Sequence, residues 1–156
     1  MVFRNDFPDL KQEHFPALRP GAYTVTSRAD NDYNCIAWAA GDSSRCWDDE
    51  DEDLYWPTKA TIRDGTLASL IEAFSTLEFE LCESGELEPS YERIAIYGVG
   101  VTWCHVAKQL SNGHWSSKCG KLDDLSHNSV GDVYCDAYGI VRHYMRRRKR
   151  PPDAGE

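Results

Sequence analysis

The 156-residue sequence predicts a single domain of the α+β class. Two helix patterns come first along the chain, and strand patterns fill the second half. Helices that precede a run of strands, instead of alternating with them, are typical of α+β domains. We therefore expect N-terminal helices packed on an antiparallel sheet that is formed by the C-terminal half.

The first helix pattern is CIAWAAG, residues 35–41, in which alanines favour a helix and Gly41 suits its end. The second is DGTLASLIEAFSTLEF, residues 64–79. Its apolar side chains recur at helical spacing and predict one buried face. These are Leu67, Leu70, Ile71, Phe74 and Leu77. The polar segment 42–66 between the two predicts a long loop.

Strand patterns begin with RIAIYGVG, residues 93–100. Residues 104–110 and 114–120 flank an Asn-Gly pair, which predicts a β-hairpin. DLSHNSV, residues 124–130, indicates a short helix or turn, and AYGIVRHYMRR (137–147) a final strand.

We expect the domain to span residues 1–145, with residues 1–30 as an extended arm that carries one short strand or turn, AYTVT. Residues 146–156 begin with the basic run RRRKR and are expected to form a disordered tail.

The net charge of −9 and the pI of about 5.0 argue against general nucleic-acid binding. No segment has the apolar length of a membrane span, and the N-terminus lacks the apolar core of a signal peptide. We therefore expect a soluble, cytoplasmic protein, and export by a dedicated secretion machine stays open. The acidic run DDEDED, residues 48–53, is either a solvated loop or a docking site for a protein partner.

Six cysteines without a secretory signal do not predict a disulfide framework. They include no C-x-x-C pair. Five cysteines and histidines of the second half could supply zinc ligands, but their spacing matches no common zinc pattern. That set is Cys104, His105, Cys119, His127 and Cys135. We expect neither a metal nor another cofactor.

Cys35 begins the first helix pattern, and a helix N-terminus favours the reactive thiolate. A nucleophilic thiol also needs a rigidly held base. His105, at the start of a hairpin strand, is our first choice, and His127 is the second. Ser117, on the returning strand, could orient the imidazole. The alternative is that Cys35 and His105 are ordinary core residues.

YNCIAWA followed by HVAKQLSNGHWSSK resembles the NlpC-type, papain-like cysteine peptidases and amidases. The resemblance implies Cys35 as nucleophile, His105 as base and Ser117 as third catalytic residue. It also implies a papain-like fold in which a thiol-bearing helix packs on a sheet that carries the base. The sequence departs from that family at Asn34, at residues 36–37 and at Ser117. The wider pattern is similar to a group of small uncharacterised bacterial proteins with an NCIAWAAG motif, which implies no activity.

Four further residues are candidates for oxyanion or substrate binding: Asn34, Lys118, His127 and Trp38. The alternative is a helix cap for Asn34, an exposed strand lysine for Lys118 and a core residue for Trp38.

The sequence therefore favours a cysteine hydrolase or acyl-transferring enzyme that attacks a peptide or protein amide through a thioester acyl-enzyme. One alternative is a non-catalytic acidic binding or immunity-type protein. The other is an effector or toxin with the same Cys-His chemistry.

Overall fold

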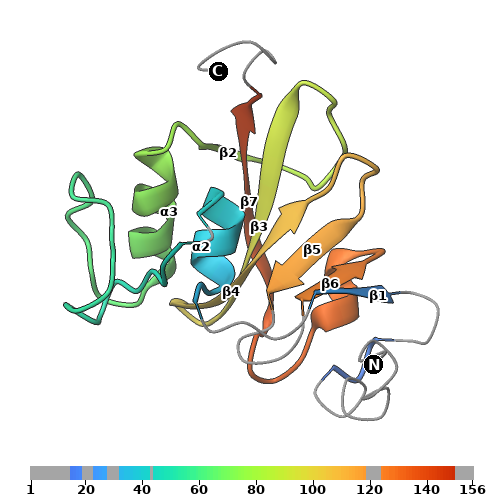
Figure 1. Ribbon diagram of the computed structural model, residues 1–156, viewed down its shortest axis with the longest axis horizontal. Coiled ribbons are helices and arrows are strands. Elements are labelled where there is room, and N and C mark those ends of the chain that lie inside the picture. Colours follow the sequence, from blue (N-terminus) through green and yellow to red (C-terminus); the bar gives the residue numbers. More distant parts are fainter. Residues whose placement is uncertain (1–14, 19–22, 28–31, 43, 119–123, 150–156) are drawn as a thin grey trace.

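The structure is a computed structural model that describes residues 15–18, 23–27, 32–42, 44–118 and 124–149. Its main feature is a seven-stranded antiparallel sheet, with strand order β1-β6-β5-β4-β3-β7-β2 (Figure 1). The strands are β1 (Tyr23–Ser27), β2 (Glu80–Cys82), β3 (Tyr91–Val99), β4 (Thr102–Gln109), β5 (Trp115–Lys118), β6 (Asp124–His127) and β7 (Ile140–Arg148).

The centre of the sheet is the β3-β4-β5 meander. β3 is buried on both faces, which explains the nearly continuous apolar run IAIY at residues 94–97. The predicted hairpin between β4 and β5 is confirmed, and Ala107 pairs with Ser117. Its turn places Gly113 at a φ of +89°, a conformation that glycine adopts without steric cost.

Both predicted helices are present. α2 spans Cys35–Ala40 and ends at Gly41, whose φ of +86° provides the left-handed C-cap. α3 spans Leu67–Ser75, and the Thr66 side chain accepts a hydrogen bond from the Ser69 backbone N–H at its start. A short 3₁₀ helix, η2 (Val130–Val133), follows β6.

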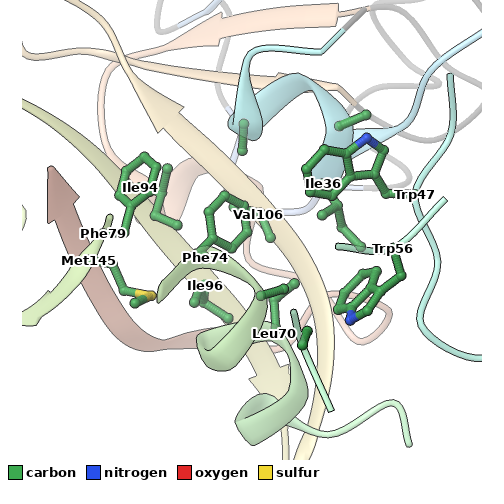
Figure 2. Packing of buried hydrophobic residues seen from close by; sticks show 14 of the residues in the cluster. Ile36, Trp47, Trp56, Leu70, Phe74, Phe79, Ile94, Ile96, Val106 and Met145 are labelled. Atoms are coloured by element: carbon green, nitrogen blue, oxygen red, sulfur yellow. The ribbon is translucent and has the colours of Figure 1, made fainter. Parts of the chain in front are cut away.

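The sheet separates two hydrophobic clusters. The first joins α2 and α3 to the sheet, and Figure 2 shows Val106 and Ile96 of the sheet facing Ile36 and Phe74 of the helices. The second cluster contains the neighbouring sheet residues Ala95, Tyr97 and Ala107. Because successive strand residues point to opposite faces, alternate residues of β3 and β4 belong to different clusters.

The predicted α+β, papain-like fold is wrong, because the chain forms a mainly-β fold with one large sheet. The helices are only six and nine residues long, so they do not form a helical half of the domain. The sheet also contains two further strands. β1 lies in the expected arm, where AYTVT was expected to be a strand or turn, and β6 occupies residues that were expected to be a helix or turn.

The last strand also differs from expectation. β7 continues to Arg148, three residues into the predicted tail. Arg146 pairs with Glu80 and Glu88, and Arg147 pairs with Glu92. Arg146 and Arg147 are thus tied to acidic residues of β2, of β3 and of the segment between these strands. The rest of the predicted tail, 150–156, and most of the predicted arm lie outside the described residues.

Candidate functional site

Asn34 is the N-cap of α2, and both polar atoms of its side chain form hydrogen bonds. Its Oδ1 accepts hydrogen bonds from the backbone N–H groups of Ala37 at 3.2 Å and Trp47 at 3.1 Å. Its Nδ2 donates to the Trp47 carbonyl at 2.6 Å. The bond from Ala37 confirms the helix-cap interpretation, and the two bonds with Trp47 join the start of α2 to the following loop.

The Cys35 thiol lies between α2 and β4 and is held as a neutral thiol. Burial raises its pKa to about 11, and this effect exceeds the opposing one of the backbone N–H groups of Val106, Ile36 and Cys35. The charge of Lys118 also acts against this rise in the pKa, but only weakly. Since the thiolate is the nucleophilic form, this environment makes Cys35 a poor nucleophile near neutral pH.

A buried chain of hydrogen bonds links three of the predicted site residues. His105 Nε2 lies 3.0 Å from Ser117 Oγ, which lies 2.8 Å from His127 Nε2. His127 Nδ1 lies 2.8 Å from the carbonyl oxygen of Ser129. The structure therefore brings His105, Ser117 and His127 together, as hydrogen-bonding neighbours on three adjacent strands and the turn after them.

The acceptor at the end of this chain fixes the proton positions. A carbonyl only accepts, so His127 donates from Nδ1 and accepts from the Ser117 hydroxyl at Nε2. Ser117 in turn accepts from Nε2–H of His105. This order leaves His105 Nδ1 as a bare acceptor, and that buried atom has no hydrogen-bond partner among the described residues.

Both imidazoles are neutral near pH 7. Burial and the nearby His127 lower the pKa of His105 to about 3. Burial is also the main cause that lowers the pKa of His127. The His105 ring, 1% exposed, stacks on Tyr138 with ring centroids 4.0 Å apart. A base with this pKa binds a proton only weakly at neutral pH.

The structure does not bring Cys35 and His105 together. Cys35 packs against the cluster that contains Val106, the residue after His105. His105 instead contacts Tyr97 and Tyr138, which belong to the cluster on the opposite face. The sheet therefore lies between the thiol and the imidazole that were predicted to form a pair.

Lys118 and Trp38 lie on the Cys35 face instead. Trp38 Nε1 donates to Ser116 Oγ at 3.0 Å, which fastens α2 to β5. Lys118 has no exposed surface, and its Nζ lies 3.7 Å from Asp124 Oδ1 and 5.4 Å from the centre of the Tyr33 ring. An opposite charge and an aromatic face both stabilise a buried ammonium group.

The acidic run 48–53 lies in a loop that is anchored at several points. Trp47 and Trp56 on either side of it are buried in the first cluster (Figure 2). Inside the run, Asp49 is 3% exposed, and its Oδ2 accepts hydrogen bonds from the Gly65 N–H at 2.8 Å and from the Ser69 hydroxyl. Asp49 thus ties the loop to the start of α3.

The other carboxylates of this run face solvent. Glu50, Asp51, Glu52 and Asp53 are exposed. Among the described residues, none of these four side chains forms an ion pair. The Asp48 and Asp51 side chains accept from the backbone N–H groups two residues ahead, at 2.8 and 2.9 Å, which fixes the turns between them. We call residues 48–53 the acidic loop.

Two residues that contribute to these regions, Asp49 and Tyr138, were not identified from the sequence. Asp49 is one of six successive acidic residues, and nothing in its sequence neighbourhood sets it apart from the exposed ones. Tyr138 is the stacking partner of His105, but it lies 33 residues away along the chain. Neither local pattern nor composition indicates such a contact.

A family model described as a domain of unknown function, DUF7689, matches residues 24–146. The chain belongs to this family. The match begins in β1 and ends in β7, two residues before that strand ends, so it includes residues of all seven strands. Neither a curated protein nor a solved structure matches the chain.

No helix in the described ranges has the length and apolar character required to cross a membrane.

Proposed function

We propose that the protein is a non-catalytic binding protein that docks a basic protein partner on its acidic loop. The observation that carries this proposal is the contrast between the two candidate regions. The thiol of Cys35 has a raised pKa and is separated by the sheet from His105. The acidic loop presents four exposed carboxylates on an anchored backbone.

The energetic argument concerns the order of the loop before binding. A flexible loop loses conformational entropy when a partner orders it, whereas an anchored loop has already lost it on folding. Trp47, Trp56 and Asp49 supply the anchors. Exposed carboxylates of one sign also attract a basic partner over a Debye length and raise its association rate.

The test uses a fluorescein-labelled hexa-arginine peptide as a basic probe, with fluorescence anisotropy at low salt. Neutralising the loop with E50Q, D51N, E52Q and D53N should weaken binding at least tenfold. A matched control removes the same number of exposed acids elsewhere, with E78Q, E83Q, E86Q and D136N. The control should change the affinity less than twofold. Equal losses in both variants would show that net charge alone attracts the peptide, and would overturn the proposal.

A second candidate keeps the cysteine hydrolase chemistry but replaces His105 by Lys118 as the partner of Cys35. It is favoured by one observation: Lys118 is buried on the Cys35 face of the sheet, and its charge acts weakly against the rise in the Cys35 pKa that burial causes. In this candidate, K118M should abolish hydrolysis of a peptide amide and slow alkylation of Cys35. An unchanged alkylation rate in K118M, with the fold retained, would eliminate it.

As part of the proposal we place the protein in the cytoplasm, where a binding or immunity-type protein would meet its partner. Export by a dedicated machine would instead suit an effector.

A further inference from the structure

A pocket lies at the acidic loop, and only some of the acidic residues of the loop line it. Asp49, Glu50, Glu52 and Arg63 line a pocket of about 310 Å³. Three carboxylates face one guanidinium in this lining, so the pocket favours a cation over an anion. Asp51 and Asp53 belong to the same loop but do not line the pocket.

The second observation is an unsatisfied buried acceptor. The carboxylate of Asp49 uses only Oδ2 for its hydrogen bonds, which come from Gly65, Ser69 and, at 3.5 Å, the Trp103 indole. Asp49 Oδ1 is buried and has no hydrogen-bond partner among the described residues. A buried carboxylate oxygen without a donor is costly, and a cationic N–H group would relieve that cost.

Glu50 lies at the same place. A Cβ atom on Gly65 would sit 2.5 Å from Glu50 Oε1, so the glycine is what lets the Glu50 carboxylate approach the backbone there. Gly65 also donates its N–H to Asp49. The carboxylates of Asp49 and Glu50 therefore both lie beside Gly65.

We propose that this pocket binds one lysine or arginine side chain of the protein partner, with Asp49 Oδ1 as its innermost acceptor and Glu50 and Glu52 as its outer carboxylates. This inference rests on the proposed function and specifies how the acidic loop selects a partner. An organic cation is the favoured occupant because, in the part of the chain that the structure describes, no three acidic, histidine or cysteine side chains converge on a metal-sized site.

The experiment uses N-acetyl-arginine amide as a probe with a single cation, titrated into ¹⁵N-labelled full-length protein. The Gly65 amide and the Trp103 indole signals should shift, since both groups donate to Asp49. N-acetyl-citrulline amide, a neutral probe of the same shape, should shift neither signal. E50Q/E52Q should weaken binding at least fivefold, and D49N should abolish it.

The matched control is D51N/D53N, which removes the same charge from the same loop outside the pocket. It should change the affinity for the single-arginine probe less than twofold. Equal weakening in both double variants, or no shift at Gly65 and Trp103, would overturn the pocket proposal. The proposed function would still stand if hexa-arginine binding is weakened by neutralising the acidic loop and not by neutralising the control acids. If the loop variant and the control variant lose hexa-arginine affinity equally, the proposed function itself is overturned. Circular dichroism and thermal melting of D49N show whether its loss of binding reflects unfolding. If D49N is unfolded, the affinity of E50Q/E52Q tests the pocket instead.

Discussion

Cys35 and His105 lie on opposite faces of one antiparallel sheet, although both residues contact β4 or belong to it. The thiol packs beside Val106, and the imidazole, one residue earlier in the strand, stacks on Tyr138. A proton cannot pass directly between two groups that a sheet separates. The order and spacing of Cys and His along the chain therefore suggest a catalytic pair that the fold does not assemble.

The buried histidines predict how stability changes with pH. The pKa of His105 falls to about 3, so His105 stays neutral in the folded protein while the unfolded chain takes up protons below pH 6.5. The pKa of His127 is also lowered, so His127 takes up its proton at a lower pH in the folded protein than in the unfolded chain. The unfolded state thus binds more protons, and the free energy of unfolding should fall as the pH drops from 6.5 to 4.5. Each histidine contributes at most about 1.4 kcal/mol per pH unit.

Urea unfolding between pH 7.5 and 4.5 measures this slope. H105Q should flatten it, and H114Q, at a half-exposed position of the hairpin turn, should not. The range stops at pH 4.5 because the pKa values of Glu72 and Glu88 are lowered, and their stabilising contribution is lost at lower pH. A flat profile in the wild-type protein would contradict the neutral histidine chain.

Asn34 should behave as a structural cap. N34A removes the acceptor of the Ala37 N–H and both contacts to the Trp47 backbone, so we expect it to destabilise the protein by about 2 kcal/mol. N34D keeps the cap acceptor but loses the donor to Trp47, and should cost less. Chemical denaturation of both variants measures the difference, and an N34A protein as stable as wild type would refute the role.

Asp49 should matter for stability although its neighbours do not. D49A leaves the Gly65 N–H without its acceptor and removes the contact of Asp49 with the Ser69 hydroxyl, which keeps the Thr66 carbonyl as an acceptor. This should cost about 2 kcal/mol. D53A, at an exposed position of the same loop, should change stability by less than about 0.5 kcal/mol. Thermal and urea unfolding of the two variants test the anchoring of the acidic loop. Similar costs would show that the loop is not anchored through Asp49.

Lys118 should be intolerant of single substitution. K118M leaves the Asp124 carboxylate without its buried cation, and we expect a loss of about 3 kcal/mol. The double variant K118M/D124L removes both charges and should recover part of that loss. Denaturation of the three proteins gives the coupling energy. A double variant that is less stable than K118M would contradict a stability role for the charge pair.

Local features of the fold were predictable because local physics determines them. The helix at Leu67–Ser75 follows from its apolar spacing, and the β4-β5 hairpin from its Asn-Gly turn. The fold class was not predictable in the same way. Asp124–His127, which was expected to be a helix or turn, is a strand because Tyr23–Ser27 lies beside it, although that strand comes about a hundred residues earlier. Such pairing leaves no local periodicity.

The candidate site divides along the same line. Ser117 was expected near His105 because the hairpin turn fixes their strands, and the hydrogen bond between them agrees with that expectation. The placement of Cys35 depends on which face of the sheet α2 covers. A shift of one residue along β4 would exchange Val106 for His105, so the same local pattern is compatible with either face.

The reactivity of Cys35 tests the central claim most directly. The rate of iodoacetamide alkylation at Cys35 is measured by peptide mass spectrometry from pH 6 to 11, in the wild type and in H105Q. With the pKa raised to about 11, the rate should still be rising at pH 10 and should be the same in both proteins. A rate that levels off below pH 8 in the wild type, and falls sharply in H105Q, would show a working Cys-His pair and contradict a non-catalytic protein.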